Sequence, residues 1–66
     1  MTYNVIQKYN GALTPISEWA DNLASAKQSY HHQCELLYSD KAFGAVIAIV
    51  DDKLDTVDGC KTTIKE

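Results

Sequence analysis

The six residues Ala45–Val50, Ala-Val-Ile-Ala-Ile-Val, form the longest apolar run in the sequence. A short run rich in β-branched residues is typical of a strand in the middle of a sheet. Successive side chains of a strand point to opposite faces, which divides the run into two sets. One set is Ala45, Ile47 and Ile49, and the other is Val46, Ala48 and Val50. Both sets are apolar, although the rest of the chain can cover only one face, so we expect the other face to stay open.

The N-terminal segment Thr2–Tyr9 alternates in a way that predicts a strand. Asn10-Gly11 follows, and this pair is a strong hairpin signal because both central positions of a type I′ turn need a positive φ. The expected register pairs Tyr9 with Ala12, Ile6 with Pro15, Val5 with Ile16 and Tyr3 with Glu18. Because proline has no N–H to donate, the second strand is expected at an edge of the sheet.

The residues after this turn also allow a second arrangement. Thr14-Pro15 is also a good helix start, with threonine as N-cap and proline in the first helical position. Apolar residues then recur at helical spacing through residues 16–37. The segment therefore forms either a strand to Ala20 followed by a helix from Leu23, or one long helix from Pro15. The Asn10-Gly11 signal favours the strand.

In both arrangements the segment Leu23–Tyr38 is helical, because it is rich in good helix formers. Its expected core stripe is Leu23, Ala26, Tyr30, Cys34 and Leu37, and its expected solvent face includes Gln28, His31 and Glu35. The helix is expected to pack across the sheet through that stripe.

After the central strand, Asp52-Lys53 can turn the chain into a short strand, Leu54–Val57. Asp58-Gly59 is a second hairpin signal and predicts a last strand over Cys60–Lys65. The predicted fold is α+β: a single domain over residues 1–66, with a small antiparallel sheet (ββαβββ along the chain) and one helix packed on one face.

Composition disfavours several classes of function. The chain has 66 residues and a net charge of −3. Residues 31–66 carry seven acidic residues against four lysines, and the chain has no arginine. Direct nucleic-acid binding usually needs a basic face, so a basic protein surface is the better partner. No basic-then-apolar leader pattern and no membrane-length apolar run is present, so no membrane partner and a cytoplasmic location are expected.

Motifs for chemistry are weak. His31 and Cys34 share a helix face, but Cys60 and distant carboxylates are the only further metal ligands available. The carboxylates after the central strand depart from calcium-loop spacing, and a Cys34–Cys60 disulfide is not expected in a reducing cytoplasm. We expect no metal, no cofactor and no enzyme activity, because a nucleophile motif and a phosphate loop are also lacking.

The positive signal is a possible protein-binding surface. The candidate partner-binding residues are the acids Asp51, Asp52, Asp55 and Asp58 and the strand residues Val46, Ala48 and Val50. An exposed apolar face beside acids often marks a protein interface. The alternative is that alanine and valine stand on the open face for their strand propensity alone.

Two groups of sequence features resemble known phage proteins. Asp21-Asn22-Leu23 with Ala26 and Tyr30 is similar to the helix of the Dmd family of phage antitoxins. Lys41-Ala42, the apolar strand, Asp51-Asp52-Lys53, Val57-Asp58 and Cys60 resemble the later part of that family. Asn22–Lys27 and the segment order also resemble small phage anti-CRISPR proteins.

The resemblance implies a phage-encoded inhibitor that binds a host nucleic-acid-targeting defence protein, either a toxin ribonuclease or a CRISPR effector. It leaves antitoxin and anti-CRISPR both open. The alternative from a different class is a small homodimeric structural or assembly module with no inhibitory role.

Overall fold

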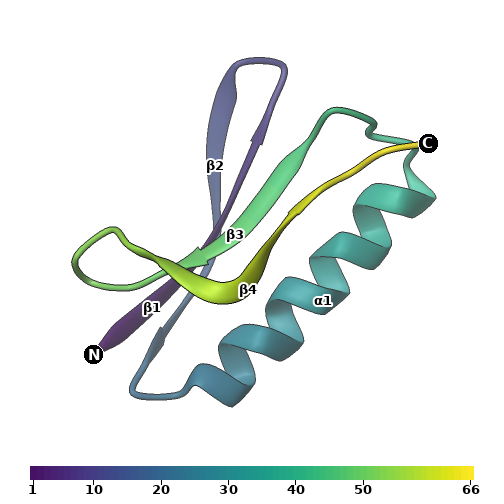
Figure 1. Cartoon of the computed structure of the whole chain (residues 1–66). Coiled ribbons are helices and arrows are strands. Elements are labelled where there is room, and N and C mark those ends of the chain that lie inside the picture. The colour runs from purple at the N-terminus through teal and green to yellow at the C-terminus, as the bar shows by residue number, and fades with distance from the viewer.

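Four strands form one antiparallel sheet, and one helix packs across it (Figure 1). The computed structural model describes residues 1–66. The elements are β1 (Thr2–Tyr9), β2 (Ala12–Ala20), α1 (Leu23–Ser39), β3 (Val46–Val50) and β4 (Thr56–Thr63). The strand order across the sheet is β2-β1-β3-β4. This arrangement confirms the predicted small α+β fold with a single helix.

The apolar run forms β3, which lies between β1 and β4, as its composition predicted. Ile47 and Ile49 are fully buried and belong to the core that α1 covers. Ala48 and Val50 lie outside that core cluster. The face bearing Val46, Ala48 and Val50 is therefore the one turned away from α1.

The β1–β2 hairpin turns at Asn10 and Gly11, which have φ of 52° and 79°. The predicted pairs Tyr9–Ala12 and Ile6–Pro15 are present, and β2 is an edge strand as expected. The register beyond Pro15 was predicted wrongly, because Ile16 is an extra residue in a β-bulge. Consequently Val5 pairs with Ser17 and Tyr3 pairs with Trp19, in place of Ile16 and Glu18.

The helix begins at Leu23, so the long helix from Pro15 does not form. Asn22 is the N-cap, and its side-chain oxygen accepts a hydrogen bond from the Ser25 N–H at 3.0 Å. The predicted stripe faces the sheet, with Ala26, Tyr30 and Leu37 buried. Leu23 and Cys34 are partly buried against the same core, and the predicted solvent-facing residues are exposed.

Polar contacts supplement this small core between α1 and the sheet. Gln33 donates to Gln7 of β1 at 2.8 Å, and the Ser29 and Ser17 hydroxyls lie 2.7 Å apart. The Trp19 indole N–H donates to the same Ser17 oxygen at 2.9 Å. The Tyr30 hydroxyl is hydrogen-bonded to Thr62 of β4. These contacts fix the helix against β1, β2 and β4.

The C-terminal half corrects the predicted strand count. Asp58-Gly59 does not form a hairpin. The region predicted as two strands, Leu54–Val57 and Cys60–Lys65, contains one continuous strand, β4, so the sheet has four strands and not five. Val50 pairs with Thr56 and Ala48 with Lys61, so four residues of β4 oppose Ile49 alone. Gly59 lies in this bulge with φ of 75°. A glycine with positive φ serves a hairpin and a bulge equally well, which explains the error.

Candidate interaction surface

The open face of the sheet has an apolar centre framed by polar residues. Residues paired across antiparallel strands share a face, so the registers place the side chains in rows. These rows are Leu13–Lys8–Val46–Thr63, Pro15–Ile6–Ala48–Lys61 and Glu18–Asn4–Val50–Thr56. The central apolar side chains are therefore supplied by β1, β2 and β3 together.

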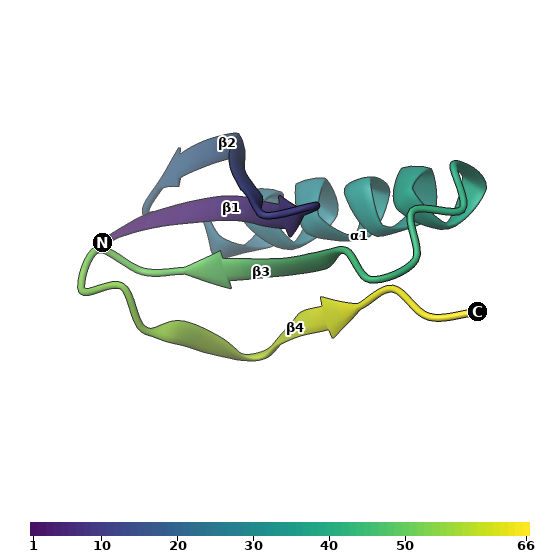
Figure 2. The same ribbon diagram turned by 90° about the horizontal axis from the view of Figure 1, so that it is seen from above.

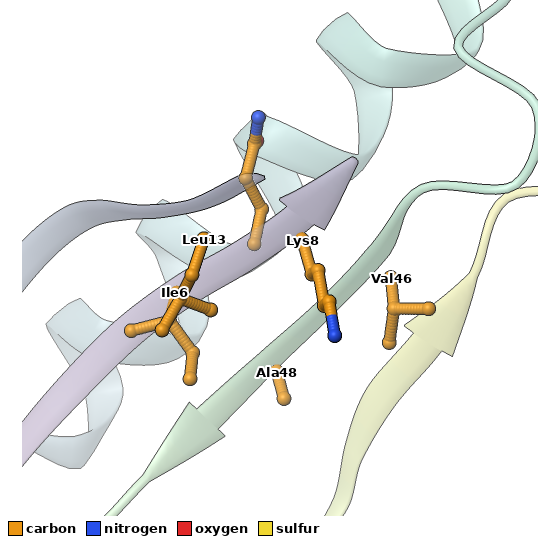
Figure 3. A pocket seen from close by; sticks show the side chains of 6 residues that line it. Ile6, Lys8, Leu13, Val46 and Ala48 are labelled. Carbon is orange, nitrogen blue, oxygen red and sulfur yellow. The ribbon is translucent and has the colours of Figure 1, made fainter. Parts of the chain in front are cut away.

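A shallow hollow of about 70 Å³ lies on this face. Its lining residues are Ile6, Gln7, Lys8, Leu13, Val46 and Ala48 (Figure 3). Leu13 stands beside the hollow and is 66% exposed. This feature can accept one small apolar group from another molecule.

The apolar side chains of β3 are less exposed on the open face than the sequence predicts. Val46 is partly exposed, but Ala48 and Val50 are only 8% and 9% exposed. Leu13, which is 66% exposed, and the partly exposed Ile6 add accessible apolar surface to this face. The alternation of Thr2–Tyr9 already placed Ile6 opposite Val5, so the sequence held the signal that would have added it.

The acids do not border the whole face. Lys8 and Lys61 are the charged residues in the rows beside Val46 and Ala48. Asp51, Asp52 and Asp55 lie in the loop between β3 and β4, at one end of the sheet. Asp58 is exposed in the bulge of edge strand β4, not at the end of a hairpin as predicted.

Asp51 organises the β3–β4 loop. Its Oδ1 accepts hydrogen bonds from the N–H groups of Lys53 at 2.9 Å and Asp55 at 3.0 Å. The Leu54 N–H donates to the Asp51 carbonyl oxygen at 3.0 Å. The Asp51 carboxylate is thus used in hydrogen bonds to the backbone of its own loop. Asp52 and Asp55 are the exposed acids of the loop. Such a turn was missed because Asp51 was considered only as a surface charge.

Leu54 is the most exposed large apolar residue of the chain, at 81%. It was predicted to begin a strand, but it lies in the β3–β4 loop with φ of 65°. Its direct neighbours in sequence are Lys53 and Asp55, and Asp52 precedes Lys53. The loop therefore presents one apolar side chain close in sequence to two exposed carboxylates and one exposed lysine.

The fold adds Asp21 to the acidic end of the sheet. The α-amino group of Met1 is hydrogen-bonded to Asp21, which raises the pKa of that amino group, and the nearby Asp52 contributes to the rise. Figure 2 shows the N-terminus and the β3–β4 loop at the same end of the molecule. Sequence reasoning missed Asp21 because the turn that carries it is far from Asp52 along the chain.

The cysteine and tyrosine side chains between α1 and β4 show no sign of an activated nucleophile. Cys34 and Cys60 are free thiols. Burial raises the pKa of Cys34, and it also raises the pKa of Tyr30. A thiol with a raised pKa is a poor nucleophile at neutral pH.

No group of three or more His, Cys, Asp or Glu side chains is placed to hold a metal ion. The single helix is not long and apolar enough to cross a membrane. No protein-family model, curated protein or solved structure matches this chain. The features that remain are the open face with its hollow and the acidic loop that carries Leu54.

Proposed function

We propose that this protein is a non-enzymatic, phage-type inhibitor that binds and blocks a host nucleic-acid-targeting defence protein. The target is a toxin ribonuclease or a CRISPR effector, and the inhibitor acts in the host cytoplasm. The observation that carries the proposal is the β3–β4 loop. There Leu54 is exposed together with Asp52, Lys53 and Asp55, on a backbone that Asp51 fixes.

The chemistry of this loop suits a nucleic-acid-binding protein. Enzymes that handle RNA or DNA line their substrate path with lysine and arginine, which hold phosphates. Exposed carboxylates can occupy such a path and speed association by attraction at long range. Leu54 then supplies apolar contact, which adds affinity without depending on salt.

The open face of the sheet adjoins the β3–β4 loop. Val50 leads directly into Asp51, and Val50, Ala48 and Val46 continue along the open face. A target that engages the loop therefore meets the end of the open face next. Asp58, in the bulge of β4, adds a further carboxylate at the sheet edge.

The experiment is capture of a target with tagged protein from a bacterial lysate, followed by assay of the purified target. We expect a ribonuclease or CRISPR effector at about one-to-one, whose cleavage of RNA or DNA stops when the inhibitor is added. Asp52→Lys with Asp55→Lys should abolish capture. The matched control is Glu35→Lys with Asp40→Lys, which makes the same charge change at exposed positions on α1 and its C-cap.

The competing function is a homodimeric assembly module without inhibitory activity. The unfilled hollow on the open face favours self-association as a property of the chain. The two functions are separated by the same capture. Recovery of a nuclease that retains full activity, or recovery of the protein itself alone, contradicts the inhibitor.

A further inference from the structure

The β3–β4 loop exposes an apolar side chain near two carboxylates, and the open face has an apolar hollow beside two lysines. We infer that the protein forms a symmetric homodimer in which the loop of each copy lies on the open face of the other. Leu54 enters the hollow between Ile6, Val46 and Ala48, and the acids of the loop meet Lys8 and Lys61. This inference does not depend on the proposed function, and because the dimer covers the loop that would contact a target, the dimer and the target complex are alternative states of that loop.

Leu54 and the hollow are two apolar features that stay exposed to solvent in the monomer. Leu54 is 81% exposed, and the hollow of about 70 Å³ is open to solvent. A shallow apolar hollow of this size takes the end of one aliphatic side chain. Moving both from water into contact is favourable in proportion to the apolar area covered.

Charged residues of the loop and of the open face give a second, separate reason for this contact. The loop carries Asp52 and Asp55 close to Leu54 together with Lys53, and Lys8 and Lys61 lie in the rows that border the hollow. These charged residues are all exposed, and the one ion pair within the chain joins Met1 to Asp21. The loop therefore has a net negative charge despite Lys53, and the two lysines beside the hollow are unpaired.

Symmetry makes the contact occur twice. The loop follows Val50 at one end of β3, and Val46 lies at the other end beside Lys8. A two-fold axis lying between the faces and running across the strands places each loop over the far end of the other copy. Such an interface uses the same surface on both copies and closes as a dimer.

The sheet edges offer no easier route to association. Pro15 and the bulge at Ile16 interrupt edge strand β2, and the bulge containing Gly59 interrupts edge strand β4. Irregular edges of this kind oppose strand addition from another chain. The open face is the remaining regular surface of the sheet.

Sedimentation equilibrium of the purified protein tests whether the dimer exists. We expect a monomer–dimer equilibrium that added salt weakens. Leu54→Ser should raise the dimer dissociation constant about tenfold or more, because it removes the apolar contact. Leu36→Ser, at an exposed leucine of α1, should leave that constant unchanged. A wild-type protein that stays monomeric up to a concentration of about 500 μM overturns the inference.

Charge exchange and intermolecular NMR contacts test the arrangement. Lys8→Glu with Lys61→Glu should weaken the dimer, and adding Asp52→Lys with Asp55→Lys in the same chain should restore it. In a mixture of labelled and unlabelled protein, we expect contacts between the methyl groups of Leu54 and Val46 of different copies. A dimer without these contacts, or without restoration by the exchanged charges, overturns the inference. Unchanged circular dichroism spectra would show that each variant is folded.

Discussion

Asp51 and Asp55 are joined by two hydrogen bonds that close the β3–β4 loop. The Asp51 N–H donates to the Asp55 carbonyl oxygen at 2.9 Å, and the Asp55 N–H donates to Oδ1 of Asp51 at 3.0 Å. Because the Lys53 N–H donates to the same Oδ1, one carboxylate holds both sides of the loop. Leu54 lies within the loop that these hydrogen bonds close, and it is 81% exposed.

Replacing Asp51 tests this role. Asp51→Ala removes an acceptor shared by two backbone N–H groups, and we expect a loss of about 1 kcal/mol in the free energy of unfolding. Asp51→Asn keeps an acceptor oxygen and should lose much less. Urea unfolding of the three proteins measures the difference. Equal losses for alanine and asparagine would show that the acceptor oxygen is not what holds the loop.

Leu37 and Leu36 are neighbours on α1 with opposite environments, 5% and 44% exposed. Leu37→Ala should lower the free energy of unfolding by about 2–5 kcal/mol, because it leaves a cavity between the helix and the sheet. In so small a domain this is enough to unfold much of the protein. Leu36→Ala should change the thermal midpoint little. A Leu37→Ala protein that melts at the wild-type temperature would contradict the packing of α1.

The glycine in the β4 bulge supplies a further test. Gly59 has φ of 75°, and a Cβ added there would meet nothing within 4 Å. Gly59→Ala should therefore destabilise the fold through backbone conformation alone, by about 1–2 kcal/mol. Gly59→Asn should cost less, since asparagine adopts positive φ more readily than alanine. A Gly59→Ala protein as stable as wild type, by urea unfolding, would argue against the bulge.

Stability should fall at alkaline pH. Burial raises the pKa of Cys34 above its ordinary value of 9.0 and that of Tyr30 above 10.0. The folded state thus keeps both groups protonated at a pH where the unfolded chain releases their protons. The stability that these two protonated groups contribute to the folded state is fully present below about pH 9, near the ordinary thiol pKa. It is lost as the pH rises through their folded-state pKa values.

Two substitutions isolate these groups. Cys34→Ser removes the thiol and should flatten the first part of the alkaline fall, and Tyr30→Phe should flatten the later part. Thermal midpoints recorded across the alkaline range measure both effects. Curves of unchanged slope in both variants would mean that neither group causes the fall.

Local patterns in the sequence were sufficient for most of the fold. Asn10-Gly11 predicted the first hairpin because both positions need positive φ, and this signal favoured a helix start at Leu23 over one at Pro15. Ala45–Val50 predicted the central strand. The bulge at Ile16 was not predictable from pairing rules, because the Ser17 contact with Ser29 of α1 that accompanies it is made between elements. Gly59 was misassigned because positive φ does not distinguish a hairpin from a bulge.

The candidate surface was less predictable than the fold. The acids were found from composition, but composition could not show that Asp51 bonds to its own loop or that Asp21 lies beside Met1. Leu54 was assigned to a strand, and its exposure follows from the loop that Asp51 closes. Lys8 and Lys61 come from different strands, so their positions on one face followed only from the observed register.

The most direct measurement of the proposed function is inhibition of nucleic-acid cleavage at low and high salt. Purified protein is added to bacterial toxin ribonucleases and to CRISPR effectors, and cleavage of RNA or DNA is followed. We expect one target to be inhibited at about one-to-one, with inhibition weakened by salt. Asp52→Lys with Asp55→Lys should weaken inhibition tenfold or more, and Glu35→Lys with Asp40→Lys should not. If no target is inhibited, or if the loop variant inhibits as well as wild type at both salt concentrations, the account of the acidic loop is wrong.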